Sequence, residues 1–119
     1  MRYVNLTPHS VTLVLDGGKR VNTIPPSGEV ARIEYRREHF ARLPGDIPVS
    51  ELTDPVVVGL PKPAMEDGEP VFYITSALVA EHVRRWDVVA PDTGRAIRDG
   101  NGRTVGVPGL VRFCCTRIE

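Results

Sequence analysis

Residues 5–10 read Asn-Leu-Thr-Pro-His-Ser and bring an amide, hydroxyls and an imidazole into one short segment. His9 is the group in this segment that can exchange a proton near neutral pH, so it is a candidate general acid or base. Catalysis would also need an orienting carboxylate and a nucleophile. Ser10 is a poor nucleophile partner, because adjacent side chains on an extended segment point to opposite faces. We favour a structural interpretation, in which Asn5 and His9 bond the backbone around the Thr7–Pro8 turn, and we assign no catalytic residue.

Three other segments carry groups that suit an anion. Turn amides and a helix N-terminus can hold a phosphate without a catalytic residue, and arginines can clamp it. With the opening segment, they give a candidate ligand-binding set: Asn5, Thr7, His9, Ser27, Arg32, Ser76, Thr93, Arg95 and Arg98. Solvated loops and ordinary helix caps explain the same residues, because one sequence does not show whether these loops converge.

Other site chemistries find little support. Asp92-Thr93-Gly94 matches the aspartic-protease tripeptide, but Pro91 replaces the hydrophobic residue that normally precedes it. A turn with Gly94 at positive φ explains the tripeptide more simply. The histidines and the adjacent Cys114-Cys115 show no pair at the spacing of zinc sites. No phosphate-binding glycine motif is present either. We therefore expect no metal and no cofactor.

Composition places the chain among globular proteins of a single domain, residues 1–119. The 15 basic and 15 acidic residues balance, which argues against a nucleic-acid partner, since such proteins usually carry a basic surplus. No apolar run has the length of a membrane span, and no signal-peptide pattern is seen. Adjacent cysteines rarely form a disulfide. Together with the lack of a membrane span and of a signal-peptide pattern, this predicts that the protein is located in the reducing cytoplasm.

The elements that must position these residues follow from local patterns. Strands at 11–15 and 20–24 flank Asp16-Gly17-Gly18 and predict a hairpin. The uninterrupted run 71–75 predicts a central strand, and Ser76 caps an expected helix over about 76–85. Further short strands are expected at 30–35, 56–58, 87–90, 95–98, 103–107 and 110–113. These elements predict an α+β fold, a mainly antiparallel sheet of short strands with one helix packed on it.

Two stretches resist this assignment. Residues 36–42 are compatible with a helical turn or a polar loop, and Pro44, Pro48 and Pro55 argue against regular structure beyond them. Residues 65–70 are expected to form an exposed acidic loop.

Five segments together resemble a known group of sequences: 5–11 (NLTPHSV), 26–32 (PSGEVAR), 59–61 (GLP), 74–80 (ITSALVA) and 87–94 (DVVAPDTG). The chain is similar to small uncharacterised proteins of actinobacteria and their bacteriophages. The resemblance implies a compact cytoplasmic or phage-encoded protein and brings no catalytic residue with it.

Three functions are compatible with these observations. The first is a non-enzymatic, homo-oligomeric binding protein that sequesters a phosphorylated small molecule or nucleotide signal, as host-defence antagonists do. The second is a hydrolase or phosphodiesterase on a similar ligand, with His9 as acid or base. The third is a protein-interaction inhibitor of a host factor that presents an exposed edge strand.

Overall fold

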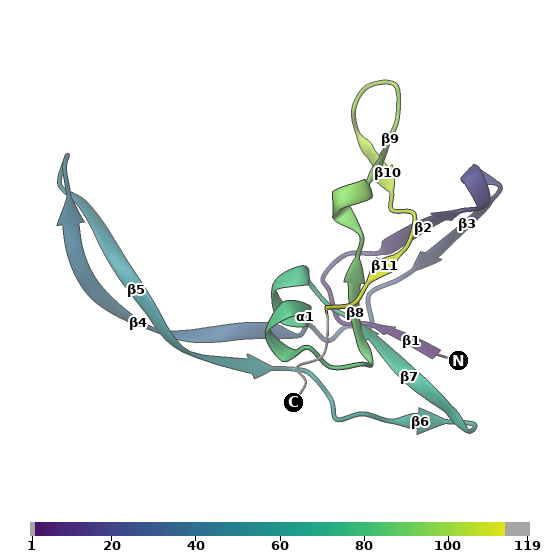
Figure 1. Cartoon of the computed structure of the whole chain (residues 1–119), viewed down its shortest axis with the longest axis horizontal. Coiled ribbons are helices and arrows are strands. Elements are labelled where there is room, and N and C mark those ends of the chain that lie inside the picture. Colours follow the sequence, from purple (N-terminus) through teal and green to yellow (C-terminus); the bar gives the residue numbers. More distant parts are fainter. Residues whose placement is uncertain (1, 114–119) are drawn as a thin grey trace, which may run out of the picture.

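The computed structural model describes residues 2–113 and is built around one mixed sheet (Figure 1). Its strands are β1 (Arg2–Asn5), β6 (Met65–Glu66), β7 (Glu69–Ile74), β8 (Val88–Pro91) and β11 (Leu110–Val111). The order is β1-β7-β8-β11, with β6 paired to β7. β7 pairs in parallel with β1 and β8, whereas β11 runs antiparallel to β8. The α+β class is therefore confirmed, and β7 is central as expected.

The one α-helix of the described residues, α1 (Ala77–Val83), crosses from β7 to β8. Its cap is the expected one, because the Ser76 hydroxyl accepts a hydrogen bond from the Val79 N–H at 3.3 Å. The helix is shorter than predicted. Arg84 adopts a left-handed conformation (φ 49°) and donates its N–H to the carbonyl of Ala80, which closes the last turn.

Short hairpins flank the sheet. β2 (Val11–Leu15) and β3 (Arg20–Ile24) pair as predicted, and Gly17 and Gly18 supply positive φ angles between them. β9 (Ile97–Arg98) and β10 (Thr104–Gly106) form a second hairpin, shorter than expected. Residues 65–70 are not a loop: β6 and β7 form a hairpin whose turn is Asp67-Gly68, both at positive φ.

The largest departure from expectation is a long hairpin in residues 32–58. β4 (Arg32–Leu43) and β5 (Ile47–Val58) are 12-residue strands, so the pair extends about 40 Å. We call this hairpin the arm. The interpretation of residues 36–55 as a helical turn or irregular loop is wrong. The expected strands at 30–35 and 56–58 are the two ends of the arm at its base.

The prolines fit the arm because none occupies an interior position of a wider sheet. Pro44 lies in the loop that joins the strands, and Pro55 lies in a bulge opposite Tyr35. Pro48 pairs with Arg42 in a ribbon of only two strands, where each strand is an edge and a missing N–H is tolerated.

Two register shifts shape the arm, one between Glu34 and Arg36 and one between His39 and Ala41. Bulges bend and twist a ribbon, and the arm curves as it leaves the body (Figure 1). The radius of gyration is 17.5 Å, whereas a compact domain of this length would have about 13.5 Å. The expectation of a compact molecule is therefore wrong, and the arm is the visible reason.

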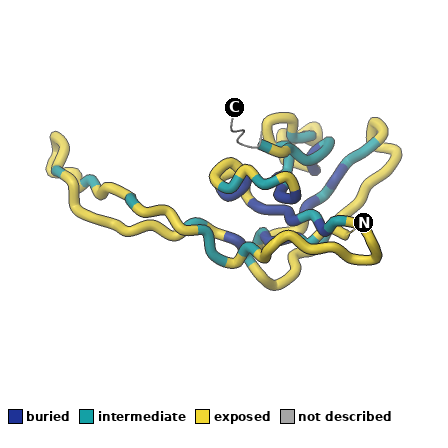
Figure 2. The backbone as a smooth tube through the Cα atoms, turned by 60° about the horizontal axis from the view of Figure 1, so that its bottom comes forward, coloured by how far each residue is buried: buried dark blue, intermediate teal, exposed yellow. Residues whose placement is uncertain are grey.

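Two apolar clusters lie on opposite faces of the sheet. The first packs α1 residues Val79 and Ala80 against the β7 residues Val71 and Tyr73. The second is formed by Val11, Leu13, Ile74 and Val107 under the β2–β3 hairpin. Figure 2 shows that burial is concentrated here, while the arm is almost entirely exposed.

The base of the arm belongs to the first cluster, because Ile33 and Val57 pack against it. Gly59, just after β5, has φ 81°, and a Cβ there would lie 2.4 Å from the carbonyl oxygen of Val30. The two chain segments therefore approach so closely at the base that only glycine fits. The arm is anchored at one end and free of the body along most of its length.

Candidate functional site

The opening segment is a closed hydrogen-bond network around Asn5, which is 1% exposed. The Asn5 Nδ2 donates to the carbonyl oxygens of His9 (2.8 Å) and Ile24 (3.0 Å). Its Oδ1 accepts from the Thr7 N–H (3.0 Å) and lies 2.7 Å from the Thr7 hydroxyl. These contacts fasten the end of β1 to the turn at Pro8 and to the end of β3.

His9 contributes to this network through its carbonyl and not through its ring. The residue is exposed, and within residues 2–113 no hydrogen bond or ion pair to its imidazole is found. Among these residues, the imidazole therefore has neither the orienting group nor the nucleophile that an acid–base role needs. The enzyme hypothesis stays a prediction.

Several members of the candidate ligand-binding set lie at one edge of the sheet. Asn5, Ile74 and Val89 are level in register, so Thr7 and Ser76 follow at the carboxyl ends of neighbouring parallel strands. Ser27 joins them, since its N–H donates to the Asn5 carbonyl at 2.9 Å. Ligands often bind at such an edge, but here the hydroxyls of Thr7, Ser27 and Ser76 all make local hydrogen bonds.

The arginines of the set do not complete an anion site there. Arg32 is exposed at the base of the arm and pairs with Glu34 at 3.3 Å. Arg98 lies on the β9–β10 hairpin and donates to the Gly102 carbonyl at 3.1 Å. Thr93 and Arg95 lie in an exposed 3₁₀ turn after β8. No buried side-chain nitrogen or oxygen of the described residues is left without a partner that a ligand would satisfy.

Sequestration of a phosphorylated ligand therefore stays a prediction, and a direct measurement tests it. If the chain holds such a ligand, denaturing freshly purified protein should release an intact phosphorylated molecule in near-stoichiometric amount, visible by mass spectrometry. Arg32→Ala should then lower the recovered amount, whereas Lys19→Ala, outside the set, should not. Release of no phosphorylated molecule would contradict the hypothesis.

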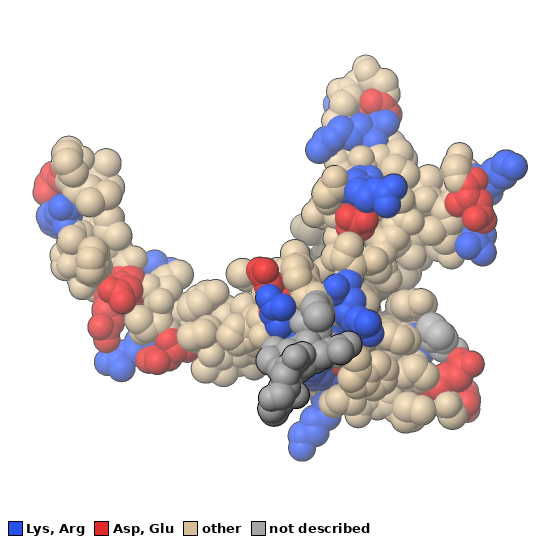
Figure 3. All heavy atoms as spheres, in the orientation of Figure 1, with Lys and Arg blue, Asp and Glu red and all other residues tan. Residues whose placement is uncertain are grey.

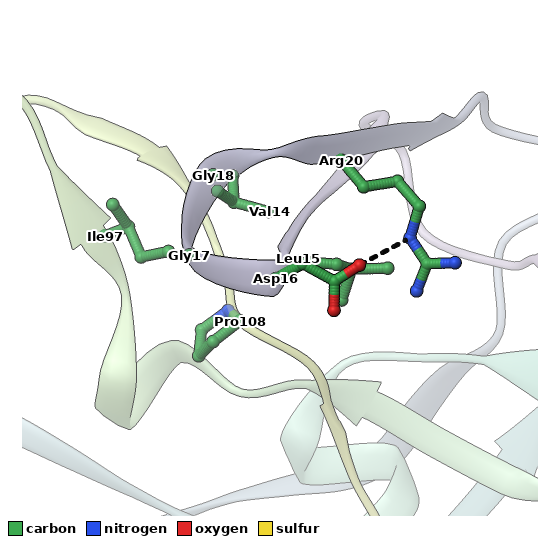
Figure 4. Close-up of a pocket in the computed structure, with 8 residues that line it drawn as sticks. All are labelled: Val14, Leu15, Asp16, Gly17, Gly18, Arg20, Ile97 and Pro108. Atoms are coloured by element: carbon green, nitrogen blue, oxygen red, sulfur yellow. Dashed lines mark ion pairs between the residues drawn. The ribbon is translucent and has the colours of Figure 1, made fainter.

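A cavity of about 630 Å³ lies elsewhere, between the β2–β3 turn and the β9–β10 hairpin (Figure 4). None of the nine candidate residues lines it. Its charged groups, Asp16 and Arg20, pair with each other at 3.4 Å and are both largely exposed. Val14, Leu15 and Ile97 supply apolar walls. The hollow is an open space between two hairpins and carries no group aimed at a ligand.

Asp92-Thr93-Gly94 forms a turn as expected, but Gly94 does not have positive φ. Within the described part of the chain, no three His, Cys, Asp or Glu side chains are grouped to hold a metal ion. In the same residues, no helix is long and apolar enough to cross a bilayer. Cys114 and Cys115 lie outside the described residues.

The arm presents an apolar end. We define the arm tip as residues 40–49. The register places the pairs Ala41–Val49 and Leu43–Ile47 on one face of the ribbon. Phe40 is 65% exposed, Leu43 52% and Ile47 56%. Large apolar groups gathered on a protruding element are typical of a protein-interaction surface.

The positive and negative charges of the arm nearly balance. Residues 32–58 contain four arginines and five acidic residues. Figure 3 shows basic (blue) and acidic (red) side chains interspersed along the arm. Three ion pairs lie within it: Arg32–Glu34, Arg36–Glu38 and Arg42–Asp46. A nucleic-acid-binding arm would need a surplus of positive charge, so the chemistry of this arm suits a protein partner.

A second exposed apolar surface lies on the sheet face opposite α1. Tyr3 of β1 pairs with Phe72 of β7, with ring centroids 6.0 Å apart, and Trp86 meets Phe72 edge-on, also at 6.0 Å. Met65 pairs with Pro70, whose position shares the face of Phe72. We call Tyr3, Met65, Phe72 and Trp86 the aromatic face. Tyr3 and Trp86 remain 42% and 43% exposed.

Sequence reasoning missed both the arm tip and the aromatic face. Signals for the arm were present: Leu43-Pro44-Gly45-Asp46-Ile47 has proline and glycine at positions typical of a tight turn between two apolar residues. The aromatic face had no local signal, since it depends on the pairing of β1 with β7.

No family model, curated protein or solved structure matches this chain.

Proposed function

We propose that the chain is a non-enzymatic protein-interaction module that binds a protein partner through the arm. The observation that carries the proposal is the arm itself, a curved two-stranded ribbon (Figure 1) that packs at its base against the first apolar cluster and ends in exposed Phe40, Leu43 and Ile47. This is the third function inferred from the sequence, a protein-interaction inhibitor, with the arm in place of an exposed edge strand as the binding element. Action in the cytoplasm and antagonism of a host factor stay finer predictions within it.

Stability considerations support a binding role. A two-stranded hairpin is marginal by itself in water, and this one receives apolar support mainly at its base, from Ile33 and Val57. Exposed Phe, Leu and Ile at its end contribute little to the stability of the free chain. Burying one such side chain fully against a partner is worth roughly 1.5–3 kcal/mol, so binding is where these residues contribute.

The available area fits the same role. A ribbon about 40 Å long and about 10 Å wide offers about 400 Å² on each face. Both faces together approach the roughly 800 Å² per partner of a stable interface. A partner that encloses the arm would therefore bury enough surface for specific binding.

Photo-crosslinking tests this function in cells that express the chain. A benzophenone amino acid at position 40 should give a light-dependent covalent adduct with a protein. The same group at Val21, which is exposed on β3, should not give that adduct. Excess unlabelled wild-type chain should suppress the adduct, and excess Phe40→Ser/Leu43→Ser chain should not. Equal labelling from both positions, equal competition by both chains, or no adduct would overturn the proposal.

A further inference from the structure

We propose that the partner is a different protein and that it adds an extended strand to the free edge of β4, which makes the arm a three-stranded sheet in the complex. The inference rests on the proposed function and specifies how the partner is bound. Three observations carry it: no other strand lies beside the arm, proline interrupts only one of its two edges, and its charges are incompletely paired.

Both edges of the arm lack a neighbouring strand. β4 and β5 pair only with each other, and within residues 2–113 no further backbone hydrogen bond joins either strand to another segment. Neither view of the backbone shows a segment beside the arm beyond its base (Figures 1 and 2). In an antiparallel ribbon, alternate residues of each strand direct their N–H and C=O away from the partner strand. Each edge is thus a row of backbone donors and acceptors, which an extended strand satisfies.

Proline removes a donor from the edge of β5. Pro48 pairs with Arg42, and because proline has no N–H, the two residues cannot exchange a pair of hydrogen bonds. They form a non-hydrogen-bonded pair, in which the backbone groups of both residues point away from the opposite strand. Arg42 therefore directs its N–H and C=O to the free edge of β4, whereas Pro48 offers no N–H on the free edge of β5.

The two edges differ along the rest of the arm as well. β5 is interrupted again near the base, where Asp54 at φ 53° and Pro55 form a bulge opposite Tyr35. β4 contains no proline, and it runs from Arg32 to His39 without an extra residue of its own. Prolines and bulges are the devices that protect an exposed edge from pairing with another chain. The edge of β4 is therefore the one that a partner strand can extend.

The charges in the middle of the arm indicate the chemistry of the added strand. Glu38 lies directly opposite Glu51, and the ion pair found for these two carboxylates in the described residues is Arg36 to Glu38 at 3.1 Å. Like charges directly opposite each other destabilise a ribbon. Arg37, on the other face, has no ion pair or hydrogen bond within residues 2–113. A partner strand with a basic and an acidic residue side by side would place an opposite charge beside both Glu38 and Arg37.

The same charges favour a different protein over a second copy of this chain. A symmetric pair of β4 strands brings equivalent faces together, because the two-fold axis stands perpendicular to the sheet. The residues of β4 that share the face of Arg37 between positions 33 and 39 are Ile33, Tyr35 and His39. None of them is acidic, so a second copy paired in this way leaves Arg37 without an opposite charge.

Two substitutions at one position separate edge pairing from side-chain contact. Arg42→Pro removes the outward N–H and leaves the β4–β5 hydrogen bonds in place, as Pro48 does on the opposite strand. Arg42→Ala removes the same side chain and its exposed ion pair with Asp46 but keeps the N–H. With the benzophenone amino acid at position 40, we expect the adduct yield in cells to fall at least about tenfold for Arg42→Pro and to change by less than about twofold for Arg42→Ala.

Charge reversal gives a second, independent variant. Arg37→Glu keeps every backbone group of the arm and should lower the adduct yield at least about fivefold, because it meets the acidic residue of the partner strand with a like charge. Lys19→Glu, an exposed change in the turn between β2 and β3, should give the wild-type yield. Circular dichroism shows whether each variant is folded, and Arg37→Glu decides the question if Arg42→Pro is not.

The failures of the two proposals are distinguishable. Equal adduct yields from folded Arg42→Pro and Arg42→Ala would overturn pairing at the β4 edge and leave the proposed function standing, and so would a wild-type yield from Arg37→Glu. An adduct at twice the mass of the chain would identify a second copy as the occupant and overturn the assignment to a different protein. Absence of any adduct from position 40 in the wild-type background would refute both proposals.

Discussion

Replacing Asn5 with aspartate is expected to destabilise the chain by about 4 kcal/mol or more, the largest effect of any single change in the opening segment. The amide donates to the carbonyls of His9 and Ile24, and a carboxylate would place negative charge against both oxygens. The position is 1% exposed, so water cannot screen that repulsion. Thermal unfolding should show a midpoint lower by about 15 °C.

Two matched variants separate the structural role of this segment from a functional one. Asn5→Ala should cost about 2–4 kcal/mol, because it leaves backbone groups unsatisfied without adding charge. His9→Ala should change stability by less than about 0.5 kcal/mol, since the residue is exposed and no hydrogen bond or ion pair to its ring is found within residues 2–113. An Asn5→Asp variant as stable as wild type would show that the network does not hold the end of β1.

Replacing Arg85 with methionine is expected to cost about 3–5 kcal/mol, more than removing its partner. Arg85 binds Asp87 through two nitrogens, Nε to Oδ1 at 2.9 Å and Nη2 to Oδ2 at 2.7 Å. The side chain of Asp87 is 0% exposed and that of Arg85 is 25% exposed. Losing Arg85 strands a buried charge, whereas an unpaired Arg85 can turn toward water.

Arg85 also anchors the segment that follows the arm. Its Nη1 donates to the Pro61 carbonyl at 3.0 Å, and the Tyr73 hydroxyl donates to the Lys62 carbonyl at 3.3 Å. Denaturant unfolding of Arg85→Met, Asp87→Val and the double variant forms the test. We expect the double variant to be more stable than Arg85→Met alone. The opposite order would contradict the account of a stranded charge.

Local signals in the sequence predicted the local elements. The β2–β3 hairpin has the bounds expected from Asp16-Gly17-Gly18, and Ser76 caps α1 as its hydroxyl and position indicated. The uninterrupted apolar run of β7 predicted that this strand is central in the sheet. In each case the information lies within about ten residues of the element.

The rest depended on contacts between distant residues. Pro48 and Pro55 predicted the end of regular structure, because proline is not tolerated inside a wide sheet. The sequence pattern does not show that Pro48 lies on an edge strand and Pro55 in a bulge, where proline is tolerated. The two bulges also shift the alternation along β4 and β5, which hides the strand period. The aromatic face needs Tyr3 beside Phe72, a pairing across nearly 70 residues that follows from burial of both apolar clusters and not from any local pattern.

The candidate ligand-binding set was predicted from residue type, which does not show the contacts that each side chain makes with distant residues. Asn5, Thr7, Ser27 and Ser76 do come to one edge of the sheet, but their polar groups serve caps and turns. Residue type alone does not distinguish a hydroxyl that binds a ligand from one that ends a helix.

The most direct test of the central claim is photo-crosslinking from position 40 of the arm tip in cells that express the chain. We expect a light-dependent adduct with a protein, which excess wild-type chain suppresses and excess Phe40→Ser/Leu43→Ser chain does not. Equal labelling from position 21, which is exposed on β3, or no adduct from position 40, would contradict binding of a protein partner through the arm.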